Sequence, residues 1–578
     1  MSVRSAAEHE EHFRQVYAVT FEPLPAYALR RVKQPADAAD SVAADLPASR
    51  DRKGVLAYID LLLRSATMRP DTGNLTSRLA AAGSAVLLGL AGAAIAAGPA
   101  SAADRHPTPG AAGLGDRLYP LLGNGGYDVQ NYDLSIFYPK KDPAQQVRGD
   151  VTITAVATQS LSRFDLDFGG DGVGKVTVNG RPAAFSRSGD ELVITPRWPL
   201  ANHRRFTVTV SGFTATPIAP NASSPAGFVK TPDGTVMAGQ PDQSHQLFPS
   251  NDHPRDMATY TIRMTAPVGW TATANGQPIR TTQHNGYVTS TYREFNPMAS
   301  ELIQLAVGDF VTYNRAPVNG IPIRDVVPRR LADKLLPEAA DERNEVAWME
   351  SKVGRYPFER YGSLVIDGNL GFALETQSLS LYDTGFFSLP TVIINPILTH
   401  ELAHQWFGDS VAPWVWSDVW QNEGHATWYE VLYAYETGTL PQYAGVSTLD
   451  EYYKRAYANG DKWRTRYGPV AHPLRSDSIW DVFNPNVYDG GALVLFALRQ
   501  KIGVSNFERL ERAWVAKYRG KSASTQDFIA LASRVSGQDL RSFLNDWLYG
   551  AKTPPMPGHP DWTTTAVASS SVAPALHR

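Results

Sequence analysis

The chain contains no cysteine among its 578 residues. Disulfide bonds and thiolate metal ligands are therefore excluded, and a metal site would have to use histidine and carboxylate side chains. The formal charge of −3 shows no large excess of either sign and indicates no nucleic-acid partner. Hydrophobic residues make up 43% of the chain, which is typical of a globular protein, and the length is sufficient for two or three domains.

The segment from Leu79 to Ala97 carries no charge and follows an arginine. Its alanine and glycine content makes it a weak membrane span, and the small residues at 100–102 provide a signal-peptide cleavage site. A signal peptide is therefore favoured over a membrane anchor. We expect residues 68–102 to be a signal peptide that starts near Met68, and the mature protein to be secreted, to begin near Ala103 and to have no stable membrane span.

Residues 1–67 do not fit with this export signal, because a signal sequence has to emerge first to be read. Three short stretches within residues 1–45 resemble the opening of region 2 of an extracytoplasmic-function sigma factor: His12 to Tyr17, Tyr27 to Val32 and Ala36 to Asp40. The matching segment is too short to form that domain. We therefore interpret residues 1–67 as a spurious or remnant extension.

A helix that ends near Gly408 is predicted from local signals. Asn395 suits the N-cap position, and Pro396 suits the first helical position, where a missing backbone N–H has no cost. Within this helix, His400 and His404 stand four residues apart, so both imidazole rings leave the same face and can bind one ion. The alternative is an amphipathic helix whose histidines are core residues.

Glu401 lies beside the two histidines and completes an HExxH pattern, in which the histidines bind zinc and the glutamate acts as general base. Tetrahedral zinc needs a third protein ligand from another element. Glu423 follows His404 after eighteen intervening residues, at the start of a second helical segment, and is predicted to be that ligand. His425 would point away from the metal on this helix and is predicted to be structural.

The motif HELAHQWFGDS, followed by NEG with its glutamate at position 423, resembles the gluzincin family headed by aminopeptidase N and leukotriene hydrolase. This resemblance implies a zinc peptidase with one Zn²⁺ per chain, bound by His400, His404 and Glu423. It also implies a saddle-like β domain before a thermolysin-like catalytic domain. The fold class we expect is therefore a multidomain α+β protein.

Residues 124–318 are expected to form the β-rich domain. From Gly125 onward the hydrophobic pattern has a period of two, which is typical of strands. The segments that show it are Tyr127 to Tyr138, Val147 to Ala157, Phe206 to Phe213, Thr259 to Met264, Tyr287 to Phe295 and Leu302 to Tyr313. The pairs Asn179-Gly180 and Asn275-Gly276 predict hairpin turns. Residues 103–123, rich in proline and glycine, are expected to be a disordered linker.

Gln240 is a candidate substrate-binding residue. The stretch Leu247 to Pro254, which follows it, resembles a segment of the same family. In relatives, the residue twelve positions before the one matched by Asp252 is a glutamine or glutamate that reaches the N-terminal end of the substrate. Here that residue is Gln240. The alternative is a loop glutamine exposed to water.

The catalytic domain is expected over residues 319–550, after a boundary signalled by proline, asparagine and glycine between Asn314 and Pro322. Glu375 in Gly371 to Gln377 matches the glutamate of the family's Gly-Ala-Met-Glu-Asn motif, and the resemblance implies that it anchors the free α-amine of the substrate. The departures from this motif, at Phe372, Leu374 and Thr376, could reshape the first specificity pocket. The alternative is that Glu375 merely ends a strand.

Tyr488 stands where relatives place a catalytic tyrosine, in the stretch Val487 to Leu495. The resemblance implies that its phenol donates a hydrogen bond to the oxyanion formed on the scissile carbonyl. A lone tyrosine among 25 carries little weight, so this role rests on the resemblance.

Further helices are expected toward the C-terminus. Ser505 with Glu508 and Ser524 with Asp527 predict capping boxes, and another helix is expected from about Asp539 to Tyr549. Residues 551–578 are rich in proline, threonine, serine and alanine and are expected to be a disordered tail. The large helical C-terminal domain of many relatives is therefore not expected, which would leave the active site more open.

The resemblance indicates a zinc-dependent aminopeptidase acting on peptides with a free N-terminus, with Glu401 and Tyr488 catalytic and Glu375 and Gln240 binding the substrate. The signal-like segment indicates that this enzyme is secreted. One alternative is an endopeptidase or another zinc hydrolase, since leukotriene hydrolase opens an epoxide on this scaffold. A second is a binding protein that keeps the fold without catalysis.

Overall fold

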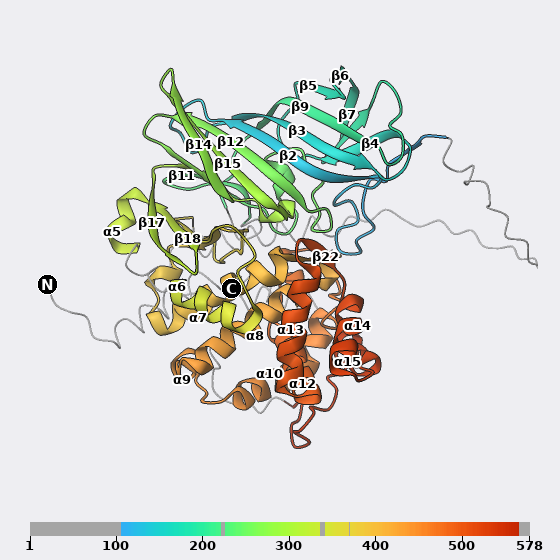
Figure 1. The fold of residues 1–578 in the computed structure, drawn as a ribbon, viewed down its shortest axis with the longest axis vertical. Helices are drawn as coiled ribbons and strands as arrows, with labels where there is room; N and C mark the ends of the chain where they lie inside the picture. The colour runs from blue at the N-terminus through green and yellow to red at the C-terminus, as the bar shows by residue number, and fades with distance from the viewer. Residues whose placement is uncertain (1–105, 221–225, 336–341, 369, 566–578) are drawn as a thin grey trace, which may run out of the picture. The chain divides into compact units, whose positions relative to one another are not determined.

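The computed structural model describes residues 106–220, 226–335, 342–368 and 370–565 (Figure 1). The sigma-factor-like extension predicted for residues 1–67 and the signal peptide predicted for residues 68–102 lie outside the described residues. Within the described ranges, no helix is both long and apolar enough to cross a membrane.

The first half of the described chain is built on an eight-stranded sheet whose long strands lie side by side (Figure 1). Side chains alternate between buried and partly exposed along strands such as β2 and β12, because successive residues of a strand face opposite sides of the sheet. The strand order is β14 (Gln277–His284), β15 (Tyr287–Met298), β12 (Ala258–Pro267), β2 (Tyr127–Phe137), β3 (Val147–Ala157), β9 (Arg205–Ala215), β5 (Lys175–Val178) and β6 (Arg181–Pro182).

Two four-stranded sheets share one buried apolar core with this large sheet, which gives the β-rich domain its layers. One has the order β1 (Thr108–Pro109), β4 (Leu161–Asp167), β8 (Glu191–Thr195) and β7 (Ala184–Ser188). The other has the order β10 (Gly227–Lys230), β11 (Gly234–Ala238), β16 (Leu305–Gly308) and β13 (Thr271–Ala274).

The predicted strands are largely confirmed. Five of the six segments coincide with β2, β3, β9, β12 and β15, and the sixth divides between β16 and β17. Asn179-Gly180 forms the hairpin turn between β5 and β6, with both residues at positive φ. The hairpin predicted at Asn275-Gly276 is wrong. The strands on either side of it pair in different sheets, and the Asn275 side chain instead donates a hydrogen bond to the Leu302 carbonyl at 3.1 Å.

The domain boundary predicted at residues 318/319 is also wrong in detail. Asn319 and Gly320, with φ of 49° and 85°, form the turn between strands β17 (Phe310–Val318) and β18 (Ile321–Pro328). An asparagine–glycine pair favours such a hairpin turn as readily as a linker, because both residues tolerate positive φ. In the same sheet, β18 pairs with β19 (Ser363–Ile366), and β19 pairs with β20 (Ser380–Asp383). One sheet therefore contains residues from both sides of the predicted boundary.

The predicted linker and tail are anchored to the rest of the protein by a few buried side chains within the described residues. Leu118 and Leu122 are buried, and the Asp116 carboxylate accepts a hydrogen bond from the Trp416 backbone N–H at 2.6 Å. Met556 and Trp562 are likewise buried. Disorder was therefore the wrong prediction for residues 106–123 and 551–565. Their composition does not favour helix or strand, but burial of a few apolar side chains orders irregular backbone.

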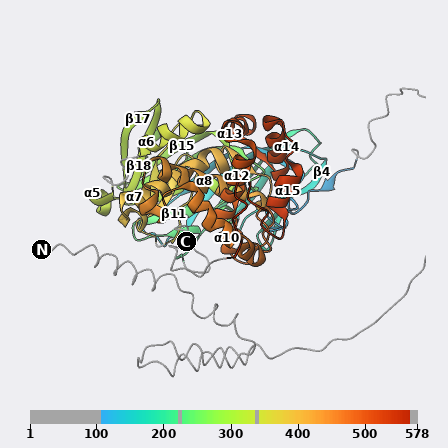
Figure 2. The same cartoon turned by 90° about the horizontal axis from the view of Figure 1, so that it is seen from below.

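The second half is mainly helical, as predicted (Figure 2). Most of its helices pack around one apolar core. The longer helices are α6 (Glu342–Val353), α7 (Thr391–His404), α8 (Trp420–Glu436), α10 (Leu449–Tyr467), α12 (Asp489–Ile502), α13 (Val504–Tyr518), α14 (Thr525–Ser536) and α15 (Arg541–Tyr549). The shorter ones are α5 (Ala332–Leu335), α9 (Leu440–Ala444) and α11 (Ile479–Val482), and a small parallel pair joins β21 (Val411–Pro413) to β22 (Lys521–Ala523).

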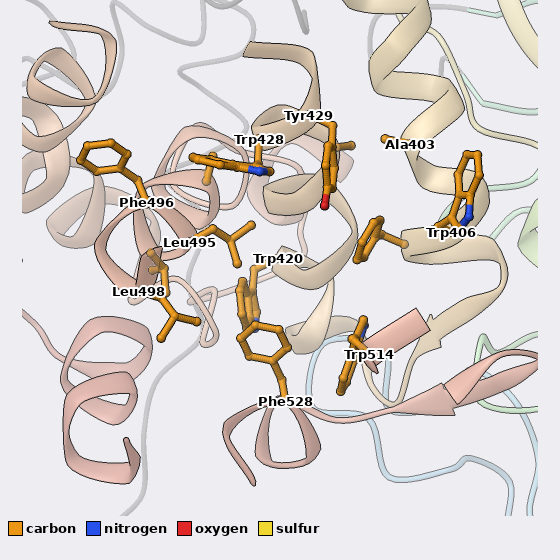
Figure 3. Close-up of a cluster of buried hydrophobic side chains, with 14 of the residues drawn as sticks. Ala403, Trp406, Trp420, Trp428, Tyr429, Leu495, Phe496, Leu498, Trp514 and Phe528 are labelled. Atoms are coloured by element: carbon orange, nitrogen blue, oxygen red, sulfur yellow. The ribbon is translucent and has the colours of Figure 1, made fainter. Parts of the chain in front are cut away.

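An aromatic cluster fixes α8 in this core (Figure 3). The Trp420 ring meets Phe528 of α14 edge to face, with ring centroids 5.5 Å apart, and Phe528 meets Trp514 of α13 at 5.3 Å. Where α8 crosses α12, a Cβ on Gly424 would lie 2.9 Å from the Cα of Gly491. Glycine is therefore needed at this crossing, which brings the N-terminal ends of both helices together.

Two predicted helix starts are wrong and one is confirmed. α7 begins at Thr391, so Asn395 is not its N-cap and Pro396 lies inside it. The extra turn is stabilised by burial of Ile394, which packs in the cluster around Tyr382. α13 begins after Gly503 without a side-chain cap, whereas Ser524 and Asp527 form the predicted capping box of α14.

Candidate active site

The two helices α7 and α8 bring together the three predicted metal ligands. Nε2 of His400 and Nε2 of His404 each lie 3.3 Å from the same oxygen, Oε2 of Glu423. All three side chains are buried. His425 lies apart from them, with its ring stacked on Phe407 at 4.3 Å, as expected for a structural residue.

The spacing of these atoms fits a tetrahedral metal. Ligand atoms about 2 Å from a tetrahedral zinc are about 3.3 Å from one another, which is the separation of both histidine nitrogens from Glu423 Oε2. A second group, Glu375, Glu401 and His404, also has its ligand atoms within 4.8 Å. That group fits less well, because Glu375 already accepts a hydrogen bond from Gln240 at 2.8 Å and only one histidine contributes.

The other nitrogen of each histidine is held by a hydrogen bond. Nδ1 of His400 lies 2.8 Å from Oε2 of Glu430, and Nδ1 of His404 lies 3.1 Å from the carbonyl oxygen of Phe407. These contacts leave Nε2 of both rings for the metal. Glu430 is not among the residues predicted from the sequence. Its place on α8, seven residues after Glu423 and therefore on the same helix face, could have indicated it.

The charges of the ligands suit a cation. Burial alone would raise the pKa of Glu423, but His404 and His400 outweigh it and lower the pKa to about 2. Burial alone would lower the pKa of His400, but the contacts with Glu423 and Glu430 raise it to about 9. Both histidines thus lie in a strongly negative environment, which favours a bound metal cation.

Glu401 and Tyr488 border the metal ligands. Burial, opposed by the two histidines, raises the pKa of Glu401 to about 8, and a bound cation would favour its charged form. The Tyr488 ring stacks on His400 with centroids 5.9 Å apart and an angle of 14°. Burial raises the pKa of Tyr488 well above its ordinary value, so its phenol stays protonated and can donate a hydrogen bond.

Gln240 comes from the β-rich half of the chain and meets Glu375 from the helical half. Gln240 Nε2 donates to Glu375 Oε1 at 2.8 Å. Gln405, directly after α7, donates to the backbone carbonyl of Glu375 at 3.1 Å and so ties this segment to the zinc helix. The structure therefore brings all seven predicted site residues together, and Gln240 is not a loop residue in free water.

These residues line one pocket, which together with the solvent at its mouth holds about 640 Å³. Its polar part consists of the seven predicted residues. Its remaining walls are apolar: Pro241, Phe372, Ala373, Leu374, Phe386, Ile397, Ile479, Trp480 and Phe483. Two of the positions that depart from the family motif, Phe372 and Leu374, therefore shape the pocket directly, whereas Thr376 is buried behind it.

Comparison with known proteins identifies the family that the helical half of the chain resembles. Residues 344–547 match the peptidase family M1 domain. The chain carries an M1 peptidase domain. The resemblance to aminopeptidase N-like zinc metallopeptidases is thereby confirmed. The metal of the site is zinc. The expected fold, a β-rich domain followed by a helical domain, is that of two-domain M1 structures.

Among curated proteins, the chain is similar to human glutamyl aminopeptidase, with 25% identity over 320 residues that make up 53% of this chain and 33% of that protein. Aminopeptidase N of Streptomyces lividans is 27% identical over 360 residues, covering 58% of this chain and 40% of that protein. The chain thus spans about a third of the length of the curated relatives it matches.

Among solved structures, the chain is similar to an M1 zinc metallopeptidase from Deinococcus radiodurans, with a TM-score of 0.67 and 29% identity over 77% of this chain and 99% of that one. A mutant of that metallopeptidase bound to a Tyr-Ser-Ala substrate matches with a TM-score of 0.66 and 29% identity over 78% of this chain and 100% of that one.

Proposed function

We propose that this protein is a secreted zinc-dependent aminopeptidase that removes N-terminal residues from peptides. The observation that carries the proposal is the pair formed by Gln240 and Glu375 beside the metal ligands. A carboxylate and an amide at one side of a zinc site can bind the protonated α-amine of a peptide and so place its first peptide bond at the metal. The similarity to proteins named aminopeptidases supports the same function.

The residues of the site divide the reaction between them. When bound, zinc supplies Lewis-acid polarisation of water and of the scissile carbonyl. Glu401 accepts the proton of the attacking water and delivers it to the leaving amine. The phenol of Tyr488 donates a hydrogen bond to the oxygen that becomes negative in the transition state. Glu375 holds the α-ammonium group of the substrate throughout.

Hydrolysis of paired substrates tests this proposal. Protein that starts at Ala103 should hydrolyse free aminoacyl arylamides and lose this activity when zinc is removed by a chelator. The N-acetylated forms of the same arylamides should be poor substrates. Equal rates on both forms would favour an endopeptidase or another zinc hydrolase on this scaffold, and zinc binding without hydrolysis would favour a non-catalytic binding protein.

Secretion is proposed from the uncharged segment Leu79 to Ala97 and the small residues at 100–102. Expression of protein that starts at Met68 in a bacterial host with a secretory pathway, followed by N-terminal mass spectrometry of the exported protein, tests it. We expect an N-terminus at or near Ala103. Active protein found only in the cytoplasm with residues 68–102 still present would contradict secretion without affecting the proposed activity.

A further inference from the structure

A second buried carboxylate stands behind the amine site. Gln240 Nε2 lies 2.8 Å from Glu375 Oε1 and 3.2 Å from Glu301 Oε2. The NH₂ group of glutamine has two hydrogens, so these two carboxylates can use both of them. Gln240 and Glu375 line the pocket, whereas Glu301 is only 1% exposed and is not part of the pocket wall. Glu301 therefore does not contact a substrate in the pocket directly, and its hydrogen bond to the pocket wall is made through Gln240.

The backbone around Glu301 is fixed against the loop that carries Gln240. Ser244 Oγ, four residues after Gln240, donates to the carbonyl oxygen of Ser300 at 2.8 Å. A Cβ on Gly239 would lie 2.6 Å from the carbonyl oxygen of Glu301, so the two backbones pack too closely for any side chain there. The contact between Gln240 and Glu301 is thus set by main-chain packing on both sides.

The fold gains little from this carboxylate. Oε1 of Glu301 is buried and has no hydrogen-bond partner within the described part of the chain. A buried oxygen left without a partner is unfavourable, and such a group in a folded protein calls for an explanation other than stability.

We propose that Glu301 is a positioning residue that fixes the orientation of the Gln240 amide for recognition of the substrate's α-ammonium group. An ammonium group has only N–H donors, so it needs the carbonyl oxygen of Gln240 and would be repelled by its NH₂ group. With both N–H groups held by Glu301 and Glu375, the carbonyl oxygen is left to face the amine. Without Glu301 the amide can rotate and lose this acceptor. This inference rests on the proposed aminopeptidase function.

Two variants test the hydrogen bond between Gln240 and Glu301. Glu301→Gln keeps an acceptor oxygen within reach of Gln240, whereas Glu301→Asp withdraws the acceptor by one methylene. The carbonyl oxygen of Gln240 should bind the α-ammonium group equally well in the ground state and in the transition state. Loss of its orientation should therefore raise KM and leave kcat nearly unchanged. We expect Glu301→Asp to raise KM for a free leucyl arylamide by about tenfold with kcat changed less than about threefold, and Glu301→Gln to stay within about threefold of wild type in both.

A double-variant cycle with Gln240→Ala shows whether Glu301 acts through Gln240. In that background, Glu301→Asp should raise KM no further. Zinc content and melting temperature of each variant identify effects of misfolding. The inference is overturned if Glu301→Gln raises KM as much as Glu301→Asp, if neither variant changes KM, or if the effects of Glu301→Asp and Gln240→Ala multiply.

The same data distinguish this inference from the proposed function. If wild-type protein hydrolyses N-acetylated and free arylamides equally, the aminopeptidase proposal fails and the role of Glu301 fails with it. If wild-type protein strongly prefers free amines but the cycle shows independent effects, only the role of Glu301 is wrong.

Discussion

The Nδ1 atom of His400 lies 2.8 Å from Oε2 of Glu430, and both side chains are buried. The phenol of Tyr443 also donates a hydrogen bond to Oε1 of this glutamate. Glu430 thus holds the imidazole ring of one metal ligand from behind and is itself oriented by a tyrosine. A carboxylate in this position fixes the histidine tautomer and strengthens the nitrogen that faces the metal.

We expect Glu430→Ala to weaken zinc binding by roughly 10–100-fold, because the ring of His400 loses its orientation and part of its basicity. Competition with a chromogenic chelator measures the affinity. Glu436→Ala is a matched control, since Glu436 lies on the same helix and pairs with Lys352 at 2.6 Å. Equal zinc affinity of Glu430→Ala and wild-type protein would contradict this role.

The third zinc ligand is tested by comparing Glu423→Ala with Glu401→Gln. Glu423→Ala should lose most of its zinc and essentially all activity, because two histidines alone leave the metal short of a protein ligand. Glu401→Gln should keep its zinc and still be inactive, since it loses only the general base. Metal analysis of the dialysed proteins decides between these roles. Stoichiometric zinc in Glu423→Ala would show that the third ligand is another residue.

Glu375 should determine the preference for a free N-terminus. A carboxylate that binds a protonated amine contributes about 1.5–3 kcal/mol. Glu375→Ala should therefore lower kcat/KM on free aminoacyl arylamides by roughly tenfold to more than a hundredfold, with zinc content unchanged. N-acetylated arylamides should remain poor substrates of both proteins. If kcat/KM of Glu375→Ala equals that of wild-type protein on both free and N-acetylated arylamides, the amine site lies elsewhere.

The apolar pocket walls should select the first side chain of the substrate. That side chain leaves the same carbon as the α-amine, so it lies near Glu375 and its neighbours Phe372 and Leu374. No lysine or arginine occurs among the described residues that line the pocket. Leucyl and phenylalanyl arylamides should thus be hydrolysed faster than glutamyl arylamide. The side-chain carboxylate of the glutamyl substrate would lose its hydration in the pocket without gaining a cationic partner.

Phe372→Ala provides the corresponding variant. It should lower kcat/KM for the phenylalanyl substrate more than for the alanyl substrate, by roughly tenfold, since apolar contact is lost only for the larger side chain. A glutamyl arylamide that proves to be the best substrate would contradict the assignment of these walls to the first side chain.

His245 should make the stability of the β-rich domain depend on pH. Burial alone would lower the pKa of His245, but Asp190 and Asp252, the latter at 2.7 Å from Nδ1, raise it well above its ordinary value. Because the folded-state pKa is raised, the stabilisation is fully present below the unfolded-state pKa of about 6.5 and decreases as the pH rises through the folded-state pKa.

Urea unfolding of wild-type protein and His245→Gln, with zinc in constant excess, measures this effect. The difference in free energy of unfolding between them should be largest near pH 6 and should shrink at alkaline pH. A difference that stays constant from pH 6 to pH 10 would show that His245 acts through packing alone.

Features that depend on a few neighbouring residues could be read from the sequence. The spacing of His400 and His404 places both rings on one helix face wherever an α-helix forms, because the helix repeats every 3.6 residues. The capping box of Ser524 and Asp527 is likewise local. Alternation with a period of two identified most long strands, because one face of each is buried in a common core.

Features that depend on distant segments were decided by the tertiary structure. Asn275-Gly276 and Asn319-Gly320 carry the same local signal, yet only the second is a hairpin turn, because strand pairing is set by the core and not by the turn alone. Family resemblance placed Gln240 near the substrate, but its contacts with Glu301 and Glu375 arise only when segments 61 and 135 residues away are packed together. A local pattern cannot specify such contacts, because they follow from how sheets and helices bury their apolar faces against one another.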